Sequence, residues 1–158
     1  MWFRSNGENL GRDGCRIPLP WSADGPSCGF NVTGQTWLPQ PSEWSSLARD
    51  AQEGDEASTL EMYRRALRLR RQEPALGDGP FDWMPNTPTQ TLAYRRSTAV
   101  PGYESVLVVI NLGAEPIGLP RGWGTDVLLT SGPDVASLTG EQGACAVVGA
   151  HTAVWLRA

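Results

Sequence analysis

The sequence predicts an α+β chain in which an irregular first third leads, through one amphipathic helix, into a small antiparallel β-sandwich. Residues 1–54 have no sustained period of 3.6 or 2, although they hold four of the seven tryptophans. A capping motif and an apolar stripe follow over residues 58–73. From Gly79 onward, short apolar runs alternate with turn residues. These patterns divide the chain into residues 1–76 and residues 79–158.

The irregular first segment is unusual for a self-contained domain. About 50 residues without regular elements are rare in such domains, and loops of this length are usually functional or belong to a larger domain. We therefore expect the first part to come from a larger domain. The sequence leaves open whether the chain is a truncated reading frame or a short protein in its own right.

One strong helix is predicted over residues 58–73. Ser58 and Glu61 form a Ser-x-x-Glu capping box, in which each side chain bonds a backbone N–H of the first turn. Pro74 ends the helix because it lacks an N–H and its ring breaks the ladder. Leu60, Tyr63 and Leu67 form an apolar stripe that should pack on something large. Five arginines occupy the other face, and solvation is favoured over phosphate binding there: Arg64, Arg65, Arg68, Arg70 and Arg71.

The second part is predicted to be all β. Its apolar runs are short, are bounded by glycine and proline, and lie at the spacing of an antiparallel sandwich. The run from Val106 to Leu112 is apolar enough to be a central strand. Strands are predicted over residues 81–84, 91–96, 105–112, 116–120, 125–131, 144–149 and 152–158.

Composition excludes several classes of function. A net charge of -4 and a sequence pI near 5.0 argue against nucleic acid as the partner, because that partner needs a concentrated basic surface. The sequence has no run of about 18 apolar residues and no secretory leader pattern, so we expect a cytoplasmic protein without a membrane partner. Cys15, Cys28 and Cys145 form no metal-ligand spacing, and the reduced state is favoured over a Cys15–Cys28 bridge.

The β half shows no catalytic pattern. Its acids stand singly in turns or at strand ends and are interpreted as solubility and turn residues: Asp82, Glu104, Glu115, Asp126, Asp134 and Glu141. His151 could act as a general base in principle, but no acid is near it in sequence, so a structural role is favoured.

The segment GRDGCR differs, because it brings Arg12, Asp13 and Arg16 together in one glycine-flanked loop. The following IPLPW favours an extended backbone. An arginine fixed by a neighbouring carboxylate is a good donor to sugar hydroxyls, since its planar fork keeps its geometry and charge. The competing interpretation is a salt bridge that only stabilises the conformation of the loop, and spacing alone favours that interpretation.

Four segments resemble, in order and spacing, the closing part of bacterial α-glucosidases of the α-amylase superfamily, glycoside hydrolase family 13. They are GRDGCRIPLPW (11–21), WLPQP (37–41), EGD (53–55) and STLEMYRRALRLRR (58–71). The resemblance is weaker but continues through the β half. It implies the end of a (β/α)8 barrel followed by the β-sandwich called domain C. The first 54 residues would then be the loop after the eighth strand, and the predicted helix the eighth barrel helix.

The same resemblance assigns roles to the loop. In the similar enzymes the first arginine of R-D-x-x-R bonds the nonreducing glucose at the −1 subsite, which implies that role for Arg12 and favours cleavage from the chain end. Asp13 and Arg16 are expected to shape the loop. Trp21, Trp37 and Trp44 could stack on sugars, but anchoring of the loop to the barrel is favoured.

The implied function is hydrolysis, with retention, of α-glucosidic bonds in short α-linked gluco-oligosaccharides. Such hydrolysis uses two carboxyl groups about 5 Å apart. In the similar enzymes these groups and an assisting aspartate lie on upstream barrel strands, so no catalytic residue is expected in this chain, nor any cofactor or metal. A glucosyl-transferring or isomerising enzyme, such as a trehalose synthase, would have the same closing part. Linkage preference and oligomeric state lie outside what these residues determine.

The rival hypothesis is a noncatalytic module whose β-sandwich binds carbohydrate or a partner protein. It predicts an autonomous fold that binds its ligand without any upstream sequence.

Overall fold

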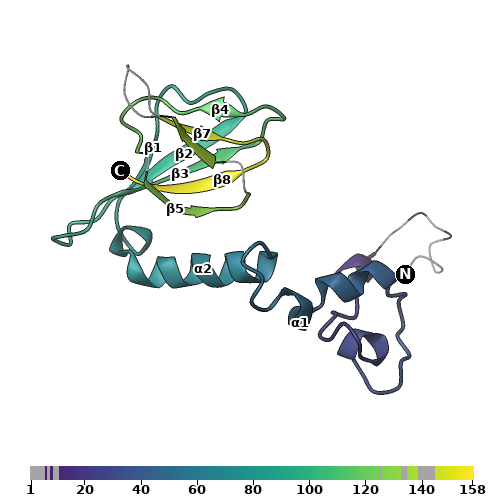
Figure 1. Ribbon diagram of the computed structural model, residues 1–158. Helices are drawn as coiled ribbons and strands as arrows, with labels where there is room; N and C mark the ends of the chain where they lie inside the picture. Colours follow the sequence, from purple (N-terminus) through teal and green to yellow (C-terminus); the bar gives the residue numbers. More distant parts are fainter. Residues whose placement is uncertain (1–5, 7, 9–10, 125, 133–134, 139–144) are drawn as a thin grey trace. The chain divides into compact units, whose positions relative to one another are not determined.

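The computed structural model describes residues 6, 8, 11–124, 126–132, 135–138 and 145–158. The chain forms two units, residues 1–61 and residues 62–158. Helix α2 continues from the first into the second (Figure 1). No helix among the described residues is long and apolar enough to cross a bilayer.

The first unit is built from short helical turns joined by extended loops. Prolines define several of these turns, since Pro26 begins one 3-10 turn and Pro41 precedes another. Its described residues contain no strand. The turns are η2 (Asp13–Cys15), η3 (Pro26–Gly29), η4 (Ser42–Leu47) and α1 (Arg49–Gln52).

Helix α2 spans Thr59–Gln72, within a residue of the predicted 58–73. Half of the predicted capping box is confirmed, because Ser58 Oγ accepts the Glu61 N–H at 3.2 Å. The other half differs. Ser58 N–H donates to the Asp55 carbonyl at 2.9 Å, and Glu61 Oε1 accepts the Gly54 N–H at 3.2 Å. Hydrogen bonds of the turn that precedes the helix thus replace the predicted bond from the Ser58 N–H to the Glu61 side chain.

Helix α2 leaves its apolar stripe uncovered. No residue of the helix is buried, and Tyr63 and Leu67 are both exposed. After Gln72 the chain enters the 3-10 turn η5 (Pro74–Leu76), as expected from the restriction that Pro74 places on the backbone.

The strands form two antiparallel sheets, with the orders β1-β2-β3-β8-β5 and β4-β7-β6. Each predicted run contains a strand. Strand β6 is additional: its residues are a weak apolar run after a turn, and backbone pairing with β7 defines it. The bounds are β1 Phe81–Trp83, β2 Thr91–Arg96, β3 Val106–Asn111, β4 Ile117–Gly118, β5 Asp126–Thr130, β6 Val135–Leu138, β7 Cys145–Val148 and β8 Ala153–Arg157.

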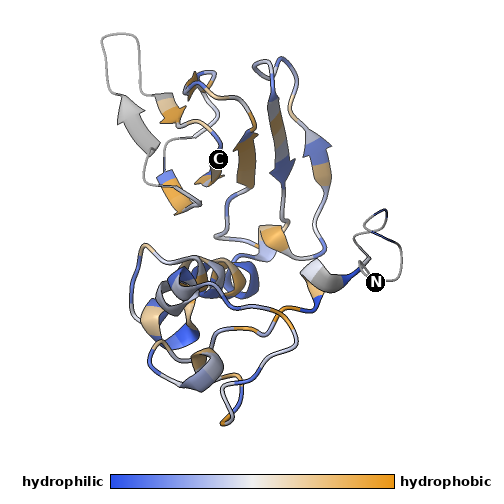
Figure 2. Ribbon diagram, turned by 90° about the vertical axis from the view of Figure 1, so that its right-hand side faces the viewer, coloured by the Kyte–Doolittle hydropathy of each residue, from blue (hydrophilic) through white to orange (hydrophobic). Residues whose placement is uncertain are grey.

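The main core lies between the two sheets. Leu107 and Leu156, of β3 and β8, are fully buried against Val148 of β7. Leu119 and Trp123, from the connection between β4 and β5, complete the cluster. The hydrophobic stretches of the strands are visible in Figure 2. Burial on this scale stabilises by about 1.5–3 kcal/mol for each large side chain.

The opposite face of the five-stranded sheet carries a second cluster. Val106 and Val108 of β3 alternate with the residues of the main core, and Ala75 of η5 packs on them. The central strand β3 is therefore buried on both faces, as the run over 106–112 predicts.

Leu107→Ala should lower the free energy of unfolding of the chain by about 2–5 kcal/mol, because it opens a cavity between two sheets. Urea unfolding followed by circular dichroism measures the change. Leu92→Ala on neighbouring β2 is the matched control, since Leu92 is exposed and should cost less than about 0.5 kcal/mol. Equal losses in the two variants would contradict this packing.

Candidate functional site

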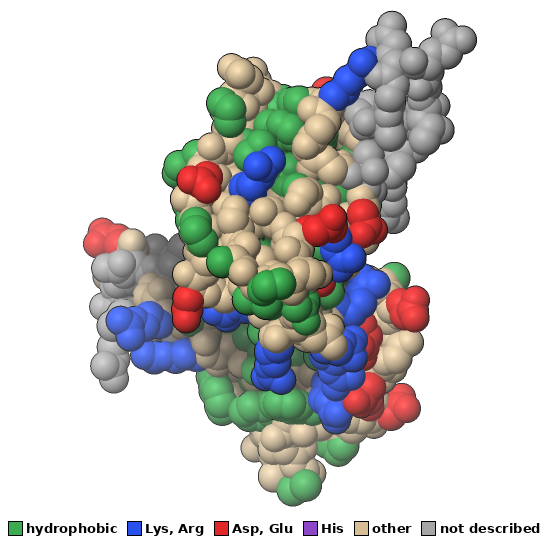
Figure 3. Space-filling view, turned by 90° about the vertical axis from the view of Figure 1, so that its left-hand side faces the viewer, with side chains coloured by type: hydrophobic (Ala, Val, Ile, Leu, Met, Phe, Trp, Pro, Cys, Tyr) green, Lys and Arg blue, Asp and Glu red, His purple; other side chains and the backbone are tan. Residues whose placement is uncertain are grey.

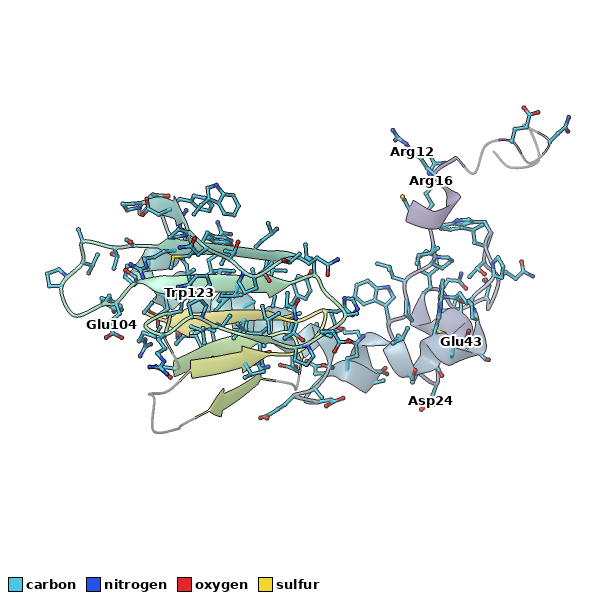
Figure 4. All side chains as sticks on the ribbon, turned by 90° about the horizontal axis from the view of Figure 1, so that it is seen from above. Arg12, Arg16, Asp24, Glu43, Glu104 and Trp123 are labelled. Atoms are coloured by element: carbon cyan, nitrogen blue, oxygen red, sulfur yellow. The ribbon has the colours of Figure 1, made fainter. Side chains whose placement is uncertain are left out.

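The arginines of the GRDGCR loop flank the 3-10 turn η2. Cys15 N–H donates to the Arg12 carbonyl at 3.0 Å, which closes the turn and sets Arg12 at its start. Arg12 and Arg16 are both exposed, and neither guanidinium bonds a described residue. Figure 4 shows both side chains at the same end of the first unit. The backbone of Asp13 lies in η2, but its side chain is outside the described residues, so the predicted Arg12–Asp13 pairing stays a prediction.

The backbone after Arg16 is held by side chains from later in the first unit. Trp37 donates its indole N–H to the Arg16 carbonyl at 2.9 Å. Gln40 Nε2 donates to the carbonyls of Pro18 and Ser27, at 3.1 and 3.0 Å. Such bonds position the loop without contributing to a core.

Trp37 combines an anchoring bond with an open ring. Its side chain is 66% exposed and meets Phe30 edge to face, with ring centroids 5.5 Å apart. The hydrogen bond joins Trp37 to Arg16 of its own loop, so the predicted anchoring of the loop to the barrel stays a prediction. Trp21 is held by its backbone, whose N–H donates to the Cys28 carbonyl at 2.7 Å.

Asp50 of α1 ties this helix to the loop that follows Trp21. Its Oδ1 accepts the Ala23 N–H at 2.9 Å, and the Ser22 side chain and this N–H lower the pKa of Asp50 below its ordinary value. A lowered folded-state pKa stabilises the folded form when the carboxyl is ionised. This contribution is present at neutral pH and is lost as the pH falls through the lowered folded-state pKa.

The described acids of the first unit do not gather around Arg12. Asp24 and Glu43 are exposed and lie apart from Arg12 and Arg16 in Figure 4. Across the described residues, no group of three histidine, cysteine, aspartate or glutamate side chains could hold a metal ion. Cys15 and Cys28 are free thiols.

The prediction that the acids of the β half stand singly is wrong for two of them. Arg157 of β8 pairs with Glu73 at 2.9 Å, with Asp126 at 3.6 Å and with Glu104 at 3.7 Å. These carboxylates come from three separate segments, so sequence spacing could not reveal the cluster. It joins the end of the last strand to the residue before η5, to the loop before β3 and to the start of β5, which is a structural role.

The remaining residues singled out in the β half have structural settings. Asp82 lies in the middle of β1, and the backbone carbonyl of Glu115 accepts a bond from the buried Asn111 side chain. His151 is an exposed turn residue with φ 50°, and its N–H donates to the Gly113 carbonyl at 3.1 Å. Asp134 and Glu141 lie outside the described residues.

Trp37→Phe should lower the free energy of local opening of the backbone around Arg16 by about 1 kcal/mol, because it removes the indole donor and keeps an aromatic ring. Amide hydrogen exchange over residues 11–21 should become about fivefold faster. Trp21→Phe is the control, since the Trp21 indole N–H bonds no described residue. If exchange is unchanged by Trp37→Phe, or if both variants accelerate it equally, the anchoring role is wrong.

Comparison with known proteins relates the whole chain to one group of enzymes. The family model "Alpha amylase, catalytic domain" matches residues 2–79. A "Probable alpha-glucosidase" of Rhizobium meliloti (strain 1021) is 38% identical over 105 residues, which cover 66% of this chain and 18% of that protein. "Trehalose synthase/amylase TreS" of Mycobacterium tuberculosis (strain ATCC 25618 / H37Rv) is 32% identical over 111 residues, with the same coverage.

A solved structure extends the likeness to the β half. A mutant of the trehalulose synthase MutB, in complex with glucose, matches 98% of this chain and 27% of its own chain, with a TM-score of 0.75 and 28% identity. The chain thus spans about 18% of the length of the curated relatives it matches.

Proposed function

We propose that this chain, which belongs to the α-amylase family, is the C-terminal portion of an α-glucosidase that acts with retention on the nonreducing ends of short α-linked gluco-oligosaccharides. The observation that carries the proposal is the loop with Arg12, exposed and set at the start of η2, in a segment that matches the family's catalytic domain. One relative named above is a probable α-glucosidase, and one solved neighbour is a complex with glucose.

Residues 1–76 would be the end of the catalytic barrel and residues 79–158 would be domain C. Two observations support this division. The match to the catalytic-domain model ends at residue 79, and the first strand of the sandwich begins at Phe81. The exposed stripe of α2 is also what a barrel helix would present when the other helices and strands are absent.

Arg12 would bind hydroxyl groups of the terminal glucose at the −1 subsite. Its guanidinium offers several donors in a fixed plane and stays charged at any physiological pH. The loop bonds from Trp37 and Gln40 restrict the backbone behind it, so less conformational freedom is lost when a sugar binds. Arg16, whose carbonyl Trp37 holds, would shape the loop together with Asp13.

The catalytic carboxylates would come from the upstream barrel. Retaining cleavage needs a nucleophile and an acid about 5 Å apart on either side of the scissile bond. On this hypothesis the chain alone is inactive, and the complete enzyme works in the cytoplasm without a cofactor.

A second candidate function is transfer or isomerisation of glucosyl groups. The trehalose synthase relatives and the trehalulose synthase neighbour favour it. Both functions share the covalent glucosyl intermediate, and they differ in whether water or a sugar hydroxyl accepts the glucosyl group. Analysis of the products formed from maltose and sucrose distinguishes them.

The 158-residue chain should release no glucose from maltose, whereas the polypeptide extended by its upstream reading frame should do so with retained anomeric configuration. Proton NMR of the first-formed glucose gives the configuration. An upstream sequence without paired barrel carboxylates would contradict the proposed α-glucosidase function. Binding of maltose by the short chain in calorimetry would instead support a noncatalytic module.

In the extended enzyme, Arg12→Ala should lower kcat/KM by about 10- to 100-fold, because charged hydrogen bonds contribute about 1.5–3 kcal/mol each. The melting temperature should stay unchanged, since the Arg12 side chain is exposed. Arg65→Ala, on the exposed surface of α2, is the matched control and should leave kcat/KM unaltered. An Arg12→Ala enzyme with full kcat/KM would exclude the sugar-binding role.

A further inference from the structure

Trp37 carries an exposed indole ring to which the catalytic proposal assigns no contact with substrate. Its N–H donates to the Arg16 carbonyl at 2.9 Å, so the polar edge of the ring already has a partner. The side chain is nevertheless 66% exposed, which leaves much of a large apolar ring in water. A tryptophan whose polar edge is bonded and whose ring is open is well suited to bind a ligand through its face.

The indole ring is held in one orientation. Phe30 meets it edge to face, with ring centroids 5.5 Å apart and an interplanar angle of 78°. A contact of this geometry occupies at most one face of the indole, so the other face is open. Because the bond to Arg16 and the contact with Phe30 both restrict the side chain, little rotamer freedom is lost when a ligand covers the ring.

The backbone between Phe30 and Trp37 is fixed by the side chain of Asn31. Its Oδ1 accepts the N–H groups of Thr33 and Gly34, both at 3.0 Å, and its Nδ2 donates to the Gln35 carbonyl at 2.7 Å. Such bonds from an asparagine to the residues that follow it close a turn. The two rings are thus presented from the ends of one hydrogen-bonded loop.

Trp37 adjoins the loop that carries Arg12. Arg16, whose carbonyl holds the indole, directly follows η2, and the Arg12 carbonyl closes η2 at its other end. A 3-10 turn rises about 2 Å per residue, so the indole edge meets the backbone one turn beyond Arg12. The open ring therefore lies beside the segment that is proposed to bind the terminal glucose.

The groups near the ring suit a neutral sugar. On the side seen in Figure 3, arginine side chains lie beside acidic ones, and Arg157, for example, pairs with Glu73 at 2.9 Å. Arg12 and Arg16 are instead exposed, and their guanidinium groups bond no described residue. The C–H groups of a sugar ring can pack on an aromatic face while its hydroxyl groups accept hydrogen bonds from such donors.

We propose that Trp37 is a specificity-determining residue of the complete enzyme, and that its indole stacks on the sugar ring next to the glucose that Arg12 binds. This inference rests on the proposed function. Because the proposed enzyme acts at the nonreducing end, no ring precedes that glucose, and the ring on Trp37 is the sugar that leaves after cleavage. In glucosyl transfer the acceptor sugar occupies the same place. The preferred substrates are then α-glucosides whose leaving group is itself a sugar.

Two substrates of the extended enzyme isolate the stacking contact. Maltose has a sugar as its leaving group and α-glucosyl fluoride has none, but both place a glucose at the −1 subsite. The ratio of their kcat/KM values therefore cancels any displacement of Arg12 that a substitution at Trp37 causes. Trp37→Gln, which keeps an N–H donor and removes the ring, should lower the maltose-to-fluoride ratio by about 3- to 10-fold.

Two further variants serve as controls for this ratio. Trp37→Phe keeps an aromatic ring, so it should change the ratio by less than about twofold. Val32→Gln, at a 92% exposed position of the same loop, should leave the ratio unaltered. An unaltered ratio in Trp37→Gln, or equal losses in Trp37→Gln and Trp37→Phe, overturns the stacking role.

Hydroxyl-radical footprinting of the extended polypeptide tests the same contact without turnover. Thiomaltose, whose glycosidic sulfur resists hydrolysis, should slow oxidation of Trp37 by about threefold, because its second ring covers the indole. Glucose, which fills only the −1 subsite, should leave the oxidation rate unchanged. Tyr103, 48% exposed in residues 62–158, is the internal reference. Equal oxidation of Trp37 with the two ligands contradicts the inference, as does a Trp37 that is unreactive without ligand.

The two proposals fail separately. Protection of Trp37 by thiomaltose in an extended polypeptide that cleaves neither substrate would support stacking and refute the α-glucosidase. An active enzyme whose maltose-to-fluoride ratio is the same with and without the Trp37 ring would do the reverse.

Discussion

The burial of β3 on both faces is the constraint on which residues 62–158 depend. Leu107 and Val109 face the second sheet, while Val106 and Val108 face the segment that follows α2. A strand buried on both faces fixes its own register, because a slip by one residue would exchange the two sets of side chains. Strands β2 and β8 pair with it on either side, and the order of the sheet follows from those pairings.

The first unit depends on a different kind of interaction. Its described loops are held by side chains that bond backbone carbonyls, as Trp37 and Gln40 do, and by the Asp50 carboxylate at the Ala23 N–H. Ala48 is its single buried apolar residue apart from Pro18 among those described, so little hydrophobic burial stabilises it. Such a segment keeps a defined backbone most readily when a larger domain supports it.

The two kinds of stabilisation fit a division of roles within the proposed enzyme. Hydrogen bonds to its backbone position the loop and leave the Arg12 side chain free to bind a sugar. In the proposed enzyme, a sandwich with its own hydrophobic core supports the barrel from outside the active site. On this proposal residues 79–158 contribute stability to the catalytic part.

The sequence by itself determined the local elements. The capping serine, the apolar stripe and Pro74 locate α2 to within a residue, and the turn-bounded apolar runs contain seven of the eight strands among the described residues. The resemblance of the GRDGCR loop and of the helix was enough to identify the family. These features depend on neighbours within a few residues, and such neighbours can be read directly along the chain.

Only the tertiary structure decided which distant groups meet. Strand β6 exists through its pairing with β7, and the Gly54 N–H, rather than that of Ser58, bonds the Glu61 carboxylate. Glu73, Glu104 and Asp126 are separated by at least two strands in sequence from Arg157, yet they converge on it. The ring contacts of Phe81 and Trp83 with Tyr94 likewise arise from the register between β1 and β2. These contacts are set by the register and curvature of packed sheets, which the order of residue types along one segment does not encode.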